Sequence, residues 1–123
     1  MTNEVQRLKA DLFRALAHPL RVQVLELLTE GERPVADLIA RTGAEASQLS
    51  QQLGVLRRAG VLVSRREASS VYYRLRDPRT LHLLATANEV LATSLTQSRE
   101  LLADLQAGDP IRAAKPRPRV RAE

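Results

Sequence analysis

The sequence predicts a mainly α-helical domain with one small β-hairpin, ordered as four helices, the hairpin and a long final helix. Apolar residues recur at spacings of three and four in stretches separated by Pro and Gly, which is typical of amphipathic helices. Two short β-type runs, 61–66 and 71–75, follow the fourth helical stretch and indicate a hairpin. We therefore expect one domain over 1–107 and a disordered Pro- and Arg-rich tail over 108–123.

The first two helices are expected to meet at the His-Pro pair at 18–19, because Pro is suited to the first turn of a helix. The first helix is expected over about 3–17. Its apolar stripe consists of Val5, Leu8, Leu12 and Leu16. The second is expected over 20–29; its periodicity alone also fits a strand, and Leu25 and Leu28 favour the helix.

The remaining helices are bounded by residues that start or stop helices. Pro34 is expected to open a short third helix that Gly43 ends, and a fourth runs over about 46–59. The residues of the third helix expected to point inward are Val35, Leu38 and Ile39. Asp77-Pro78 is expected to be the cap and first residue of the last helix.

Positive charge is concentrated in one part of the chain. The net charge of +5 divides into −1 over 1–46, +5 over 47–79, −2 over 80–107 and +3 over 108–123. A basic block between acidic or neutral segments indicates a localised surface for anions, and a polyphosphate backbone is the obvious partner. The alternative is a basic surface that only contacts solvent.

The fourth helix has an apolar and a polar face. At 100° per residue, Leu49, Leu53 and Leu56 share one stripe that should pack inward. The residues expected on the outward side are Ser47, Gln48, Ser50, Gln51, Gly54 and Arg58. Gln can read base edges and Arg can bind phosphate, although a solvated Gln-rich face fits equally well. Gly54 fits either a close approach to phosphate or an ordinary surface position.

Arginines flank the tip of the expected hairpin: Arg65 and Arg66 precede it, and Arg74 and Arg76 follow it. Two short helices across a Gly turn followed by a basic hairpin are the winged helix-turn-helix arrangement, in which the hairpin contacts phosphates or a minor groove. The sequence therefore predicts binding to double-stranded DNA. The residues expected to contact DNA are Ser47, Gln48, Ser50, Gln51, Gln52, Arg58, Arg65, Arg66, Ser69, Ser70 and Arg74.

Two segments carry a resemblance to a known family. LFRALAHPLRVQVLELL and SQLSQQLGVLRRAGVLVSRREASSVYYRL resemble the opening helices, the recognition helix and the wing of the ArsR/SmtB family of bacterial repressors. The resemblance covers about residues 8–95. Two positions depart from it: Gln52 stands where His is commonest, and Ala68 where the wing usually turns on Gly. The resemblance implies a winged helix-turn-helix repressor, released from its operator by an inducer.

The resemblance also implies a homodimer built on the first and last helices, acting on a palindromic operator. The last helix supports a dimer independently, because residues at alternating steps of three and four form a heptad seam; an intramolecular packing face is the alternative. The residues expected at the dimer interface are Leu8, Leu12, Leu84, Asn88, Leu91, Leu95 and Leu102.

Neither metal site implied by the resemblance has its ligands here. Pro34 and Ala36 stand where many members have a Cys pair. In the last helix Asp77 matches one of four expected ligands; the other three positions are Arg79, Val90 and Thr93. We therefore expect no metal and no cofactor, and the inducer stays unknown. His18 and His82 are expected to be structural or surface residues.

Composition excludes several classes of function. The chain has no Cys and two His, so disulfides and thiol chemistry are excluded and an enzyme is not expected. No apolar run is long enough to cross a bilayer and no secretory signal opens the chain, so we expect a cytoplasmic protein without a membrane partner.

Two other functions stay open. One is a metal-responsive repressor with an atypical site around His18 or His82. The other is a winged domain that contacts protein or RNA. The basic tail either adds nonspecific DNA affinity or aids solubility.

Overall fold

The computed structural model describes residues 3–107 of the 123-residue chain. The chain forms two compact units, Met1–Leu84 and Ala85–Glu123. The single domain expected over 1–107 stays a prediction, and the tail expected over 108–123 lies outside the described residues.

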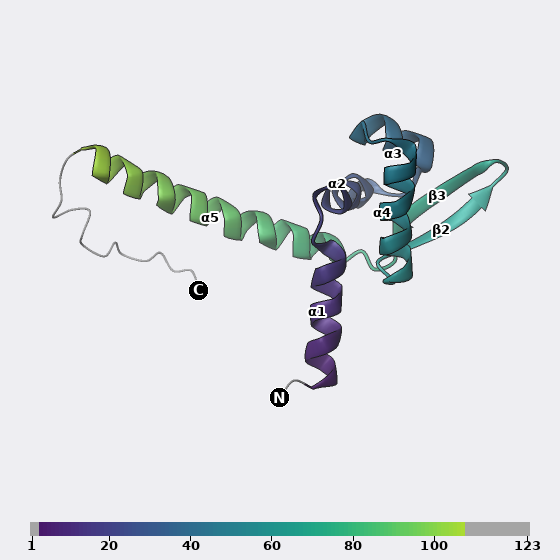
Figure 1. Cartoon of the computed structure of the whole chain (residues 1–123), viewed down its shortest axis with the longest axis horizontal. Helices are drawn as coiled ribbons and strands as arrows, with labels where there is room; N and C mark the ends of the chain where they lie inside the picture. The colour runs from purple at the N-terminus through teal and green to yellow at the C-terminus, as the bar shows by residue number, and fades with distance from the viewer. Residues whose placement is uncertain (1–2, 108–123) are drawn as a thin grey trace. The chain divides into compact units, whose positions relative to one another are not determined.

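The order of elements confirms the mainly helical fold with a small sheet (Figure 1). The elements of the described residues are α1 (Glu4–Leu16), α2 (Pro19–Leu27), the 3₁₀ helix η1 (Leu28–Glu30), β1 (Arg33–Pro34), α3 (Val35–Thr42), α4 (Ala46–Arg58), β2 (Leu62–Glu67), β3 (Ser70–Leu75) and α5 (Thr80–Gln106). Among residues 3–107, no helix combines the length and the apolar character that crossing a bilayer requires.

The starts of α1 and α2 are fixed by side-chain caps. Asn3 and Gln6 form a capping box, in which each side-chain oxygen accepts the other residue's backbone N–H, at 2.8 and 3.0 Å. His18 precedes α2, and its Nδ1 accepts the N–H of Leu20 at 3.0 Å, while Pro19 takes the first helical position. His18 therefore has a structural role as a helix cap.

The sheet has three strands, in the order β1-β3-β2, and all neighbours are antiparallel. Pro34 stands at the start of the third helix as expected, since it is the N-cap residue and α3 begins one residue later, but it also belongs to a strand that was not expected: Arg33 pairs with Tyr73 and Pro34 with Tyr72. Proline lacks an N–H to donate, and it is tolerated here because β1 is an edge strand. A strand of two residues has no periodicity that a sequence pattern could indicate.

One apolar core holds the first unit together. Leu49, Leu53 and Leu56 of α4 are almost completely buried, which confirms the predicted inward stripe. The other buried apolar residues are Ala15, Val24, Leu25, Leu28, Leu38, Val61, Leu62 and Leu75. Burying each leucine stabilises the fold by about 1.5–3 kcal/mol. The core thus holds α4 against the other helices by its apolar side and leaves the opposite side exposed.

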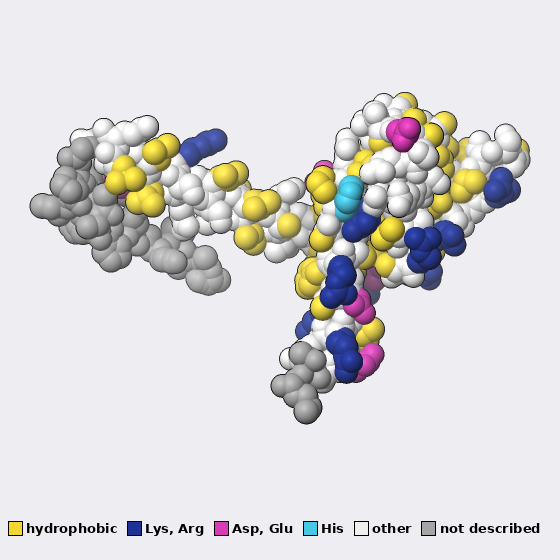
Figure 2. All heavy atoms as spheres, in the orientation of Figure 1, with side chains coloured by type: hydrophobic (Ala, Val, Ile, Leu, Met, Phe, Trp, Pro, Cys, Tyr) yellow, Lys and Arg dark blue, Asp and Glu magenta, His cyan; other side chains and the backbone are white. Residues whose placement is uncertain are grey.

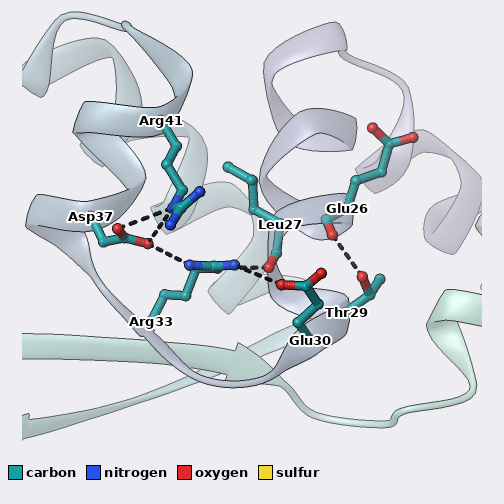
Figure 3. A network of polar contacts seen from close by, with 7 residues as sticks. All are labelled: Glu26, Leu27, Thr29, Glu30, Arg33, Asp37 and Arg41. Carbon is teal, nitrogen blue, oxygen red and sulfur yellow. Dashed lines mark hydrogen bonds and ion pairs between the residues drawn. The ribbon is translucent and has the colours of Figure 1, made fainter.

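Arg33 connects the end of α2 to the start of α3 (Figure 3). Its Nε donates to the carbonyl oxygen of Leu27 at 2.8 Å, Nη1 to Asp37 at 2.8 Å and Nη2 to Glu30 at 3.1 Å. Arg41 also donates to Asp37, and the two guanidinium groups, Arg33 first, lower the pKa of the Asp37 carboxyl below its ordinary value. The network links the end of α2 and η1 to α3.

The start of α5 differs from the expectation. The helix begins at Thr80 rather than at Pro78, so Asp77 lies three residues before its first residue and the predicted cap is wrong; the Asp77 carboxylate instead accepts the N–H of Arg79, in the turn that precedes the helix, at 3.0 Å. Hydrogen bonds from the guanidinium and the N–H of Arg79 lower the pKa of Asp77 to about 2. Within the first unit, Leu84 packs against the core of its own chain.

Candidate nucleic-acid interface

The exposed side of α4 is polar and uncharged from Ser47 to Gln51. Ser47, Gln48, Ser50 and Gln51 are all exposed, as the sequence predicts. Ser47 donates its hydroxyl to Glu45, the residue that precedes the helix, at 2.9 Å. An exposed helix with amide and hydroxyl groups offers the donors and acceptors that read base edges in a major groove.

Gln52 lies on the other side of α4. It is only 7% exposed, and its Oε1 accepts a hydrogen bond of 2.7 Å from Nη1 of Arg21. The same guanidinium donates to the carbonyl oxygen of Ala15 at 2.8 Å, which joins the end of α1 to α4. Position 52 is three residues from Leu49 and four from Leu56, so its inward direction could have been read from the helical spacing. Gln52 therefore does not belong to the surface proposed to contact DNA.

Two arginines end the exposed side of α4. Arg57, which the sequence analysis did not single out, and Arg58 are both exposed, and neither has an ion pair within residues 3–107. The guanidinium of Arg58 folds back over Gly54, where its Nη1 lies 3.0 Å from the place a Cβ would occupy. The missing side chain at Gly54 thus leaves room for Arg58.

The hairpin carries its two consecutive arginines on opposite faces, because neighbouring residues of a strand alternate in direction. Arg66 is exposed and has no ion pair in the described part of the chain. The turn is formed by Ala68 and Ser69, and Ala68 has a φ of +55°, a conformation that favours Gly. Ser69 and Ser70 are exposed at this tip.

Arg65 is held by partners of its own chain. Its Nε and Nη2 donate to both carboxylate oxygens of Glu32, each at 2.8 Å, and its Nη1 donates to Glu67 at 2.6 Å. The guanidinium carbon also lies 4.5 Å from the centre of the Tyr72 ring. The hydrogen bond from Arg65 lowers the pKa of the Glu32 carboxyl. A DNA phosphate would therefore have to compete with Glu32 and Glu67 for the guanidinium of Arg65.

The base of the hairpin is also basic. Arg74 and Arg76 are exposed; Arg74 donates to the carbonyl oxygen of Leu75 at 3.3 Å and Arg76 to that of Gly60 at 3.0 Å. Figure 2 shows the Lys and Arg side chains gathered in dark blue where α4 and the hairpin lie side by side, and toward the hairpin tip. The polar side of α4 and this basic region together make up the candidate surface.

The residues expected at a dimer interface are mostly exposed in the single chain. Leu8 and Leu12 of α1 are exposed, and so is Phe13, which the sequence analysis missed although it directly follows the stripe. In the second unit Asn88 is exposed, and the exposed apolar residues are Val90, Leu91, Leu95, Leu101, Leu102 and Leu105. Leu84 differs, since it packs within its own chain.

No group of three or more His, Cys, Asp and Glu side chains is placed to hold a metal ion among residues 3–107. The carboxylate of Asp77, the one residue that matches a ligand of the second family site, precedes α5 and receives hydrogen bonds from the Arg79 guanidinium at 2.8 and 3.1 Å.

A helix with an exposed polar side, held by two short helices and followed by a basic hairpin, defines the class of winged helix-turn-helix proteins. Comparison with known proteins narrows this class. A family model described as "Bacterial regulatory protein, arsR family" matches residues 18–64. The chain is 48% identical over 103 residues to the HTH-type transcriptional regulator Rv0081 of Mycobacterium tuberculosis, which covers 83% of this chain and 90% of that protein.

Other relatives and solved structures agree with this match. The biofilm growth-associated repressor of Xylella fastidiosa strain Temecula1 is 35% identical over 89 residues, 72% of this chain and 78% of that protein. The crystal structure of Rv0081 is similar with a TM-score of 0.71 and 46% identity, covering 79% of this chain and 98% of that one. The homodimeric winged helix-turn-helix domain Mb0332 of Mycobacterium bovis, solved by NMR, has a TM-score of 0.68 and 31% identity, covering 76% and 86%. The chain belongs to the arsR family of bacterial regulatory proteins, and it is a transcriptional regulator rather than an enzyme.

Proposed function

We propose that the chain is a repressor that binds a palindromic operator as a homodimer, with α4 in the major groove and the hairpin along the adjacent backbone. The observation that carries this proposal is the exposed uncharged side of α4, bordered by Arg57 and Arg58 and by the arginines of the hairpin. Neutral amide and hydroxyl groups supply base contacts, and the arginines supply the salt-dependent attraction to phosphate. The similarity to the Xylella fastidiosa repressor supports repression as the outcome.

Exposed apolar side chains support the homodimer. Leu91 and Leu95 are 59% and 62% exposed, and further exposed apolar residues lie along both α1 and α5. Soluble proteins rarely leave large apolar patches in contact with water, and such patches mark interaction surfaces. Mb0332 is described as homodimeric, and a dimer would present two copies of α4 to two half-sites of one operator.

DNA binding without a metal ion is part of the proposal. Pro34 and Ala36 offer no metal-binding side chains at the positions that resemble the family's Cys pair. At the other site, Arg79 occupies a ligand position and its guanidinium binds the carboxylate of Asp77. A bound cation would have to displace this guanidinium.

The test separates base reading from phosphate contact. An operator is first selected from a random DNA library with the purified protein, and affinities are then measured on operator and scrambled DNA at several salt concentrations. Gln51→Ala should weaken operator binding by about 1–3 kcal/mol and leave scrambled DNA nearly unaffected. Arg66→Ala should weaken both and lower the salt slope by about one unit. Equal losses on both DNAs for Gln51→Ala would exclude α4 as the base-reading element.

A further inference from the structure

The sheet narrows at one row of residues. β1 ends where Pro34 pairs with Tyr72, and on the other side of β3 Tyr72 pairs with Arg65. This row is the last one with three strands. Beyond it the hairpin, residues 66–71, is a two-stranded ribbon, and a ribbon of this kind is only marginally stable by itself.

Arg65 of β2 connects β3 to the segment that precedes β1. From β2 it stacks on Tyr72 of β3, and it binds both carboxylate oxygens of Glu32, which directly precedes β1. A guanidinium bound to both oxygens of a carboxylate has a defined orientation as well as a favourable energy. The pair therefore ties β2, at the last row with three strands, to the chain just before β1 on the opposite edge of the sheet.

We propose that Arg65 and Glu32 form a positioning pair that fixes the direction of the outer hairpin, so that Arg66, Ser69 and Ser70 meet the DNA. Arg65 then acts through the hairpin and does not bind phosphate itself. The proposal rests on the DNA binding proposed above, and it replaces the phosphate contact that the sequence predicts for Arg65. A hairpin already held in its bound direction loses less conformational entropy on binding, which is a gain in affinity without a new contact.

Removing Glu32 tests the proposal, because the two explanations predict opposite changes in DNA affinity. Loss of an acidic side chain from a DNA-binding protein should tighten DNA binding on electrostatic grounds. We expect Glu32→Ala to weaken binding instead, by about three- to tenfold, because Arg65 loses its main partner. Glu26→Ala is the matched control: it removes an exposed acid whose side chain has no partner within residues 3–107, and it should leave affinity equal or slightly higher.

The salt dependence gives a second readout. Arg65→Ala should weaken binding with the salt slope of the original protein, whereas Arg66→Ala should lower the slope by about one unit. Tighter or unchanged binding by Glu32→Ala, or a slope for Arg65→Ala as low as that for Arg66→Ala, would overturn the proposal.

Hydrogen exchange without DNA separates this proposal from the function on which it rests. The amides of 66–71 should exchange several-fold faster in Glu32→Ala than in the original protein, while those in α2 stay unchanged. Unchanged exchange at 66–71 would overturn the positioning role even if DNA binding is found. If these amides exchange faster but the protein binds no DNA, the Arg65–Glu32 pair does hold the hairpin in place and the proposed function is refuted.

Discussion

Replacing Gln51 or its neighbour Gln52 with Ala should have opposite consequences: the first should lower operator affinity, and the second should lower the stability of the fold. Gln52→Ala removes the acceptor of the 2.7 Å bond from Arg21, and a hydrogen bond to a charged group contributes about 1.5–3 kcal/mol to stability. Arg21 is only half-buried and keeps its bond to Ala15, so the lower end applies, and the lost buried methylene adds about 0.8 kcal/mol. We expect the free energy of unfolding to fall by about 2 kcal/mol, and Tm by about 10 °C.

The assay is urea and thermal unfolding at one fixed protein concentration, because the stability of a dimer depends on concentration. Gln51→Ala is the control, since Gln51 is exposed and its side chain has no partner within residues 3–107, and such a substitution should change the free energy of unfolding by less than about 0.5 kcal/mol. The affinity for operator DNA should show the opposite order: per folded molecule, Gln51→Ala should lose more affinity than Gln52→Ala. If Gln52→Ala unfolds like the original protein, the bond to Arg21 does not hold α4 in place.

Three further predictions concern the dimer, the turn and metal ions. Leu91→Glu combined with Leu95→Glu places charges in the proposed seam and should yield monomers or unfolded chains in sedimentation; a folded dimer would remove α5 from the interface. Ala68→Gly should raise the free energy of unfolding by up to about 1 kcal/mol in urea titrations, because φ is +55° there; a loss would show that Ala fits this turn without strain. Operator affinity should be the same with a chelator and with added zinc, nickel or cobalt, and a several-fold loss with any of these metals would contradict metal-independent binding.

Local patterns predicted most of the fold. Spacings of three and four identified the helices, and they predicted the burial of Leu49, Leu53 and Leu56. The positions of α4 that were expected to face outward are exposed or half-exposed for the same reason. A helix of 13 residues has a clear periodicity, whereas β1, with two residues, has none and was missed.

Contacts between distant residues could not be predicted in this way. Arg21 and Gln52 are 31 positions apart, and Arg65 and Glu32 are 33 apart. Composition alone makes each arginine a candidate phosphate ligand, and only the folded chain shows which of them already has an acidic partner. The sequence therefore overstated the number of free cations on the hairpin, and it missed Arg57, which is exposed beside Arg58.

Within α4 the charged and the neutral side chains are separated along the helix: residues 46–56 carry no charge, and both cations lie in the last turn. Under the proposed function, this separation affects how such a regulator diverges. Substitutions among Ser47, Gln48, Ser50 and Gln51 can change the preferred operator while the number of cations near the backbone stays constant. A duplicated gene could acquire new target sites by a few such changes and keep the same general affinity for DNA throughout.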